Sequence, residues 1–437
     1  MVRKPLIKRI LPPKELVGEI IVPGDKSISH RALILSSLAS GNSRVSNLSP
    51  GRDCESTMNC LKALGVKIDR QENLTPFVTI HGAGNSGLSE AKNVLNVGNS
   101  ATTLRLLSGV LATQPFLSIL TGDASLRSRP MKRLVEPLRL MGAEIYGRGD
   151  DSFAPVVIRG KRLHGITYSL PVPSAQVKSA ILLAGLFCQE DTIILELQPS
   201  RNHTELLLER MGVKIEQSDA CICLIPPAFP LTPVDLYVPG DISSAAYWLV
   251  AGAIHPSAKL KIKNCGVNPT RTGILDALLA MGARISQENR RLEGNEPVAD
   301  LCVESSQLRA TEVAGNMVPR LIDEIPLLAI AACLAEGDTV IRDASELRVK
   351  ESDRITTTVQ QLSRLGAAIE ELPDGMVIHG GKTLLGTEVN SHFDHRLAMS
   401  LAIAGLAAKG ETIIHSAQIA EVSYPGFWNE IERIAWH

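Results

Sequence analysis

The chain has 437 residues, of which 44% are hydrophobic and only 3% aromatic, and its 45 Lys and Arg residues nearly balance 46 Asp and Glu residues. This length exceeds what one hydrophobic core ordinarily supports, so we expect two domains of about 200 residues. Near-neutral charge and few aromatic side chains argue against nucleic acid as a partner. No run of 18 apolar residues and no signal-peptide core is present, so we expect a cytoplasmic protein without membrane contact.

The metal-ligating residue types show no metal-site pattern. Eight cysteines are scattered without a CxxC pair, which favours reduced, mostly buried thiols. His392 and His395 have metal-like spacing, but no further ligand completes a site. We therefore expect neither a metal nor another cofactor.

An apolar helix that follows a polar turn recurs six times along the chain. In the first copy, Val22 to Ser40, we expect Ser27 to cap an Ala/Leu/Ser-rich helix that is buried on most of its circumference. The other five starts lie 67 to 82 residues apart, at Asn99, Ser174, Asp241, Asp323 and Asp394. Buried helices that begin at charged turns favour an anion site.

A second pattern alternates with the first. An amphipathic helix ends in a glycine at the C′ position and continues as a strand of alternating polarity. Its five copies place this residue at Gly65, Gly142, Gly212, Gly282 and Gly366, whereas a sixth copy near Ile431 to Trp436 lacks it. Together the two patterns predict a unit of about 70 residues that is used six times.

The repeated tetrapeptide Val-Pro-Gly-Asp marks the expected crossovers between two domains. It occurs at 22–25 and again at 238–241, and Pro-Gly pairs commonly interrupt regular structure. We therefore expect one three-unit domain at 23–239 and a second at 1–22 plus 240–437, with the active site in the cleft between them. Alternating strands and hairpin turns favour an inner helix bundle covered by sheets over a doubly wound parallel sheet.

Cations outnumber acids at the predicted helix starts. The acids of note there are Asp323 and Glu351. The surplus favours a ligand with two anionic groups, although each stretch also has a plain alternative: a surface turn, a solvated basic face, an ion-pair ladder, or an N-cap at Asp323. The cations are Lys26, Arg31, Arg105, Arg129, Lys178, Lys350, Arg354 and Arg396.

With these stretches assembled, the chain resembles the EPSP synthases, the 3-phosphoshikimate 1-carboxyvinyltransferases, over nearly its full length. The matching stretches are PGDKSISHR, GNSATTLR, GDASLRSRPM, PSAQVKSA, SRNHTE, NPTRTG, DEIPLLA, RVKESDR and DHRLAMS. The resemblance implies two inside-out α/β domains, each built from three βαβαββ units. It also implies a role in chorismate and aromatic amino-acid biosynthesis, with phosphoenolpyruvate and shikimate 3-phosphate as small-molecule substrates. We expect a monomer.

The resemblance also assigns site residues. Asp323 would accept the proton of the sugar 5-hydroxyl, and Glu351 with Lys26 would handle protons at the enol carbon. Shikimate 3-phosphate would be surrounded by Lys26, Ser27, Arg31, Ser174, Ala175, Gln176, Arg201, Asp323 and Lys350. Phosphoenolpyruvate would meet Lys26, Asn99, Ala101, Arg129, Gln176, Arg354 and Arg396.

Two departures from the family pattern concern the phosphoenolpyruvate region. Many members have glycine at the position of Ala101, and many carry a lysine where this chain reads AEVSYPGFW. Together with Ala175 and Arg201, Ala101 resembles the second, glyphosate-tolerant branch of the family. The absent lysine leaves fewer cations for phosphoenolpyruvate.

Two other functions remain open from the sequence. UDP-N-acetylglucosamine enolpyruvyl transferase shares the expected fold and donor but uses a loop cysteine, and no cysteine lies between Cys60 and Cys188. A non-catalytic anion-binding repeat protein would need the basic helix starts but not Asp323 or Glu351.

Overall fold

A computed structural model describes residues 6–71, 76–84, 87–218 and 220–436. The chain divides into two compact units, which are described separately. Unit 1 comprises Met1–Pro23, Gly240–Arg291 and Pro297–His437, and unit 2 comprises Gly24–Pro239 and Leu292–Glu296. Each unit has its own hydrophobic core.

One short stretch departs from the expected domain 240–437. Leu292–Glu296 belongs to unit 2, where the Glu296 carboxylate lies 2.7 Å from Nδ1 of the buried His203. The Asn295 amide also donates to the carbonyl of Leu206. These contacts explain why the stretch packs with unit 2, and the sequence alone gave no sign of them.

The described residues of unit 2 form three sheets of four strands each, in the orders β14-β3-β5-β4, β6-β7-β9-β8 and β10-β11-β13-β12. The strands are β3 (Asn42–Ser46), β4 (Lys67–Gln71), β5 (Phe77–His81), β6 (Leu95–Asn96), β7 (Leu117–Thr121), β8 (Glu144–Arg148), β9 (Phe153–Arg159), β10 (Thr167–Ser169), β11 (Thr192–Leu195), β12 (Lys214–Ser218), β13 (Cys221–Ile225) and β14 (Asp235–Tyr237). The helices are α1 (Lys26–Ser37), α2 (Arg52–Ala63), α3 (Ala101–Leu111), α4 (Lys132–Leu140), α5 (Ala175–Gly185) and α6 (His203–Arg210), with a 3₁₀ turn η1 at Leu126–Ser128.

Unit 1 has the same plan, with sheets β16-β17-β15-β2-β24, β18-β19-β21-β20 and β1-β23-β22. The strands are β1 (Lys8–Ile10), β2 (Glu15–Ile21), β15 (Ala258–Gly266), β16 (Arg284–Glu293), β17 (Glu296–Glu304), β18 (Glu312–Val313), β19 (Asp338–Ile341), β20 (Ala368–Leu372), β21 (Gly375–His379), β22 (Glu388–Asn390), β23 (Thr412–His415) and β24 (Ala435–Trp436). The helices are α7 (Ile242–Ile254), α8 (Gly273–Ala280), α9 (Val318–Leu321), α10 (Ile325–Leu334), α11 (Arg354–Arg364), α12 (His395–Ala407) and α13 (Phe427–Ile434), with 3₁₀ turns η2 (Gly315–Met317), η3 (Ser345–Val349) and η4 (Ala417–Val422).

The strand pairing repeats from sheet to sheet. Each sheet contains one parallel pair, such as β10 with β11 or β18 with β19, and its other recorded pairs are antiparallel. A parallel pair requires a crossover connection, whereas antiparallel strands that are consecutive in the chain, such as β12 with β13 and β20 with β21, are joined by short turns. This mixed pairing agrees with the expected repeat and excludes a doubly wound parallel sheet.

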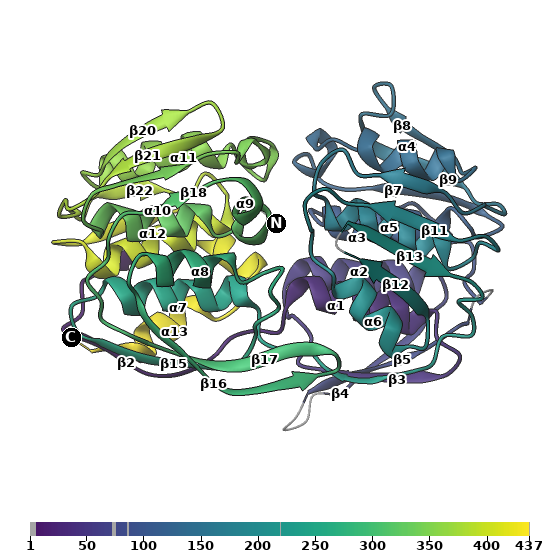
Figure 1. The fold of residues 1–437 in the computed structure, drawn as a ribbon, viewed down its shortest axis with the longest axis horizontal. Helices are drawn as coiled ribbons and strands as arrows, with labels where there is room; N and C mark the ends of the chain where they lie inside the picture. The colour runs from purple at the N-terminus through teal and green to yellow at the C-terminus, as the bar shows by residue number, and fades with distance from the viewer. Residues whose placement is uncertain (1–5, 72–75, 85–86, 219, 437) are drawn as a thin grey trace. The chain divides into compact units, whose positions relative to one another are not determined.

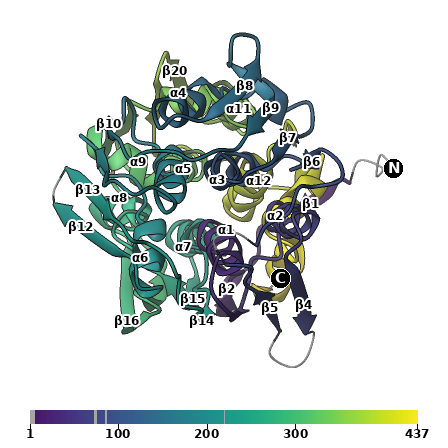
Figure 2. The same cartoon turned by 90° about the vertical axis from the view of Figure 1, so that its right-hand side faces the viewer.

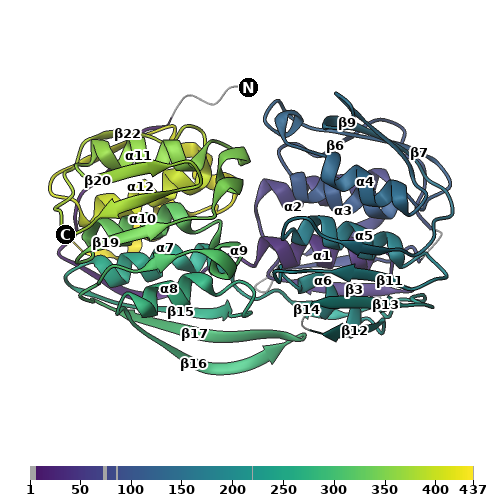
Figure 3. The same ribbon diagram turned by 45° about the horizontal axis from the view of Figure 1, so that its top comes forward.

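The nearly apolar helices lie inside each unit, and the sheets lie outside them. In unit 2, α1, α3 and α5 occupy the middle (Figure 2), and in Figure 1 they are flanked by strands such as β3 and β7. In unit 1, α7, α10 and α12 lie between β20–β22 and β15–β17 (Figure 3). The two-domain inside-out α/β fold expected from the sequence is confirmed.

The helix ends agree with the sequence better than the helix starts do. All five expected C′ glycines have positive φ, between 85° and 97°, a conformation that glycine adopts without strain. Of the six expected caps, Ser174, Asp241 and Asp394 cap their helices. The other three helices begin one or two residues away from the expected cap.

In each of these three cases the neighbouring polar residue holds the cap position. Asp25 rather than Ser27 caps α1, with its carboxylate accepting from the Ile28 amide at 2.8 Å. Ser100 rather than Asn99 caps α3, and Glu324 rather than Asp323 occupies the N-cap position of α10, without a side-chain cap hydrogen bond. Asn99 and Asp323 are therefore not committed to capping.

Candidate active-site residues

The start of α1 brings together several of the predicted residues of unit 2. The Lys26 ammonium lies 3.1 Å from the carboxylate of Asp53, and both side chains keep some exposure to solvent. Ser27 contacts two arginines: its hydroxyl accepts from Arg201 at 3.5 Å, and its carbonyl accepts from Arg31 at 2.9 Å. Lys26, Ser27, Arg31 and Arg201 thus form one basic cluster.

Arg31 is held by further hydrogen bonds within unit 2. Its side chain also donates to the hydroxyls of Thr204 at 2.6 Å and Ser179 at 2.7 Å. Burial lowers the pKa of Arg31 to about 10, partly opposed by the nearby carboxylate of Glu205. Arg31 is therefore a charged group with a fixed direction, which suits recognition of a planar carboxylate or a phosphate. No sequence pattern pointed to Thr204 or Asp53 as partners.

A second cluster joins the starts of α3 and α5 to the turn η1. Arg129 donates to the side-chain oxygen of Asn99 at 2.6 Å. Arg105 donates to the side-chain oxygen of Gln176 and, at 3.0 Å, to the carbonyl of Pro130. Gln176 in turn donates to Thr102 at 2.8 Å. Arg105, predicted as a ligand cation, is 6% exposed and instead orients Gln176.

Three further predicted residues lie at the starts of α3 and α5. Ser174 caps α5 by accepting from the amide of Val177, and Ala175 is the first residue of α5. Ala101 is the first residue of α3 and is 6% exposed. Arg129 lies in the turn before α4, which starts at Lys132 with Met131 at its N-cap.

Lys178 does not belong to either cluster. Its side chain is 1% exposed, and its ammonium lies 2.9 Å from Glu196 and 2.7 Å from Glu205. It also donates to the carbonyl of Ser200 at 3.3 Å. The prediction that Lys178 is a ligand-binding cation is wrong, because two buried carboxylates already neutralise it.

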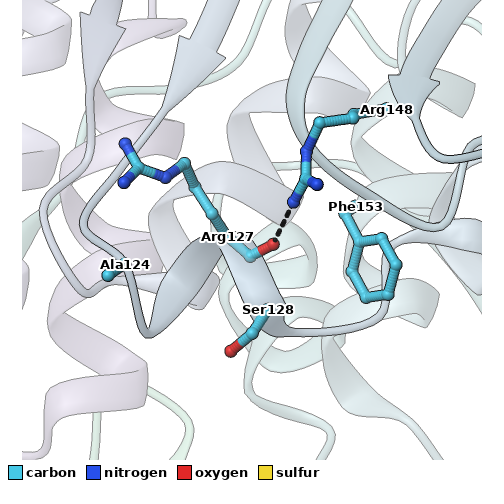
Figure 4. A pocket seen from close by; sticks show the side chains of 5 residues that line it. All are labelled: Ala124, Arg127, Ser128, Arg148 and Phe153. Atoms are coloured by element: carbon cyan, nitrogen blue, oxygen red, sulfur yellow. Dashed lines mark hydrogen bonds between the residues drawn. The ribbon is translucent and has the colours of Figure 1, made fainter.

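A small cavity opens beside η1 in unit 2. Ala124, Arg127, Ser128, Arg148 and Phe153 line about 380 Å³ (Figure 4). Arg148 donates to the carbonyl of Arg127 at 3.0 Å. None of the predicted site residues lines this cavity, so it is separate from both clusters.

In unit 1, Arg354 lies at the centre of a cluster of predicted acidic and basic site residues. Its side chain is 2% exposed and contacts three carboxylates: Asp394 at 2.7 Å, Glu351 at 2.5 Å and Asp323 at 3.4 Å. Burial opposes the charge of Arg354, but Asp394 and Glu351 outweigh that effect and raise its pKa above the ordinary value. Arg354 therefore remains charged, as an anion-binding arginine must.

Arg396 lies on the other side of Asp323. Its guanidinium is 3.6 Å from Asp323 and 3.5 Å from Glu324. Burial opposes its charge, yet Asp323 and the other neighbouring acids raise the pKa of Arg396. Burial lowers the pKa of the remaining cation, Lys350, and Asp323 partly offsets that shift.

Three of the predicted residues of unit 1 lie close together in the chain, at positions 350, 351 and 354. The helix α11 begins only at Arg354, with Asp353 as its N-cap, so Lys350 and Glu351 precede it. The ion pair between Glu351 and Arg354 forms nevertheless. The structure thus brings Asp323, Lys350, Glu351, Arg354 and Arg396 together at the starts of α10, α11 and α12.

Two observations concern other kinds of site. Among the described residues, the His, Cys, Asp and Glu side chains form no group of three or more that could hold a metal ion. No helix in the described part of the chain is long and apolar enough to cross a membrane.

The architecture defines a class of protein. The enolpyruvyl transferase NikO from Streptomyces tendae aligns over 98% of this chain and 97% of its own, with a TM-score of 0.78 at 19% identity, which shows a common fold. The chain therefore has the enolpyruvyl transferase fold.

Closer relatives then give the family. Residues 10–431 match the family described as EPSP synthase (3-phosphoshikimate 1-carboxyvinyltransferase). The 3-phosphoshikimate 1-carboxyvinyltransferases of Herpetosiphon aurantiacus and Gloeobacter violaceus are 53% and 54% identical, over 96% and 97% of this chain and 97% and 98% of their own. An EPSP synthase structure from Acinetobacter baumannii, 42% identical, has a TM-score of 0.88 over 99% of this chain and 98% of its own. The chain belongs to the EPSP synthase family and is an enzyme of the shikimate pathway.

Proposed function

We propose that this enzyme transfers the enolpyruvyl group of phosphoenolpyruvate to the 5-hydroxyl of shikimate 3-phosphate. The hydroxyl oxygen bonds to C2 of phosphoenolpyruvate while C3 gains a proton. The tetrahedral intermediate then loses that proton from C3 and expels phosphate, which leaves 5-enolpyruvylshikimate 3-phosphate. Family membership and the two groups of paired arginines and acids support this reaction.

We assign the residues of unit 2 mainly to binding. The cluster at the start of α1 provides three cations, Lys26, Arg31 and Arg201, for the phosphate and carboxylate of shikimate 3-phosphate. Ser27, Ser174, Ala175 and Gln176 complete this set. Arg129, held by Asn99, provides a fixed cation for phosphoenolpyruvate, beside Ala101 at the start of α3.

The residues of unit 1 supply charge and proton transfer. Arg354 and Arg396 bind phosphoenolpyruvate, and Lys350 binds the sugar phosphate. Asp323 accepts the proton of the 5-hydroxyl, while Glu351 and Lys26 serve the enol carbon. The observation that carries this assignment is that Asp323 does not cap α10 and instead lies between Arg354 and Arg396.

The assay is release of phosphate that requires both substrates. In that assay we expect Asp323→Asn to lower kcat by about a hundredfold or more, because a general base acts in the transition state. The KM values should change much less. Asp338→Asn, which removes an exposed carboxylate of the same unit, is the matched control. An Asp323→Asn variant with unchanged kcat would exclude Asp323 as the base.

We further propose that the enzyme is of the glyphosate-tolerant branch, and that Ala101 is one cause. Glyphosate is longer than phosphoenolpyruvate, and the Ala101 methyl narrows the space at the start of α3. Overpacking by one methyl costs about 1 to 3 kcal/mol, which corresponds to roughly ten- to a hundredfold in affinity.

The variant Ala101→Gly tests this proposal. It should bind glyphosate roughly ten- to a hundredfold more tightly than the unaltered enzyme does, while its KM for phosphoenolpyruvate stays within a few fold of the original value. Inhibition curves at matched phosphoenolpyruvate saturation measure both quantities. Equal inhibition constants for the two proteins would remove the methyl from the explanation.

We also propose that the enzyme works as a cytoplasmic monomer. Each unit buries a hydrophobic core of its own without a partner chain. Light scattering of the purified protein should give the mass of one 47.0 kDa chain. A mass of twice that value would refute the monomer.

A further inference from the structure

A chain of buried polar contacts leads from the start of α7 to Arg396 in unit 1. Asp241 caps α7 and lies 3.3 Å from the Arg271 guanidinium. Arg271 donates to the Ser243 hydroxyl at 2.7 Å, and that hydroxyl donates to Glu324. The carboxylate of Glu324 lies 3.5 Å from Arg396. Nothing in the reaction described above assigns a role to Glu324.

Glu324 is an unusual residue for this position because it is almost completely buried. Its exposure is 1%, and its second carboxylate oxygen makes no hydrogen bond within the described part of the chain. A buried carboxylate of this kind lowers stability unless a cation compensates it. The cation that compensates Glu324 is Arg396, so the charge of each side chain stabilises the other in its buried position.

The geometry also fixes a direction. One terminal nitrogen of Arg396 lies near Glu324 and the other lies near Asp323, which is the adjacent residue in the chain. Two consecutive acids therefore hold the two ends of one guanidinium. An arginine has five N–H donors, so those that face neither acid remain for an anionic ligand.

We propose that Glu324 is a positioning residue that fixes the guanidinium of Arg396 for phosphoenolpyruvate, with Ser243 and Arg271 holding Glu324 in place. This inference rests on the role proposed above for Arg396. Glu324 touches neither substrate in this scheme, and it acts only through the arginine. The sequence motifs DEIPLLA and NPTRTG contain Glu324 and Arg271, but they do not indicate that these residues are linked.

The test is Glu324→Gln, which keeps the shape and can still accept from Ser243 but loses the charge opposite Arg396. We expect the KM for phosphoenolpyruvate to rise about tenfold, with kcat and the KM for shikimate 3-phosphate within about threefold. A change confined to one KM indicates lost binding rather than lost chemistry. The matched control is Glu336→Gln, which removes one exposed carboxylate just after the end of the same helix α10.

A second variant keeps the proposal testable if Glu324→Gln folds poorly. Ser243→Ala removes the hydrogen bond to Glu324 and the one from Arg271 but keeps the Glu324 charge, so it should raise the same KM by a smaller factor. The double variant should resemble Glu324→Gln alone, because both changes act on one chain of contacts. Thermal unfolding of each variant reports whether the fold is kept.

Three results would contradict the proposal. An unchanged or lowered KM for phosphoenolpyruvate in folded Glu324→Gln would show that Glu324 does not orient Arg396. An equal rise of both KM values with a fall in thermal stability would indicate a merely structural role. If the enzyme without any substitution released no phosphate from the two substrates, the proposed reaction itself would be overturned, and this inference with it.

Discussion

Lys178 is the residue whose role the structure changes most, and its substitution gives a quantitative prediction. Replacing it with methionine preserves much of the side-chain volume but leaves Glu196 and Glu205 without their cation. Both carboxylates are buried, at 7% and 0% side-chain exposure. Removing one partner of a buried ion pair costs about 3 to 5 kcal/mol. For a unit of this size, that loss corresponds to a fall in Tm of roughly 6 to 20 °C.

The two units can be followed by different signals. All three tryptophans, Trp248, Trp428 and Trp436, lie in unit 1, so tryptophan fluorescence reports on that unit. Far-ultraviolet circular dichroism reports on the helices of both. We expect Lys178→Met to lower the midpoint temperature of the unfolding transition measured by circular dichroism more than the midpoint measured by tryptophan fluorescence.

A compensated variant is the control for Lys178→Met. The triple change Lys178→Met, Glu196→Gln and Glu205→Gln removes all the buried charges together and should recover much of the lost stability, since an uncharged replacement of a buried pair is often neutral. The reasoning would be refuted by a Lys178→Met enzyme of unchanged stability with a raised KM for shikimate 3-phosphate. That result would return Lys178 to the ligand-binding cations.

Two further predictions concern buried residues of unit 2. Burial lowers the pKa of His30 from 6.5 to about 3, so the stability due to its neutral form is complete above pH 6.5 and is lost as the pH falls from 6.5 towards 3. Between pH 6.5 and 5 this loss is about 2 kcal/mol. The free energy of unfolding, measured with denaturant, should therefore depend less on pH in His30→Asn than in the unaltered protein. Parallel pH curves for the two proteins would refute this role of His30. A Cβ at Gly109 would lie 2.2 Å from the carbonyl oxygen of Ala180. Gly109→Ala should therefore force α3 and α5 apart and lower the free energy of unfolding by at least about 1 to 3 kcal/mol. An unchanged Tm would contradict that contact.

The fold was largely predictable because its signals are local. The positions of Gly65, Gly142 and the equivalent glycines follow from the need for a left-handed residue after a helix, which few other residues meet. The apolar helices and the alternating strands follow from their periodicity. Repetition strengthens each assignment, because the same two helix patterns recur along the chain in both structural units.

The site was less predictable because it depends on which of several similar side chains meets which partner. Lys178 and Arg31 both lie on apolar helices, and only the structure shows that Glu196 and Glu205 come from other segments to neutralise Lys178. Likewise, adjacent polar residues such as Asp323 and Glu324 compete for one cap position. Spacing along the sequence does not decide that competition, because packing of the whole unit does.

The N-terminal strands have a consequence for synthesis of the protein. β1 pairs with β23 and β2 pairs with β15 and β24, so β1 completes a sheet whose other strands, β22 and β23, are among the last made. At about 5 to 20 residues per second, Lys8 waits roughly 20 to 80 seconds on the ribosome for its partner Ile414. Nearly all of unit 2 is continuous from Gly24 to Pro239 and has no such delay. The nascent chain should therefore carry a folded central unit while β1 still awaits β23, and during that interval β1 is accessible to chaperones and proteases.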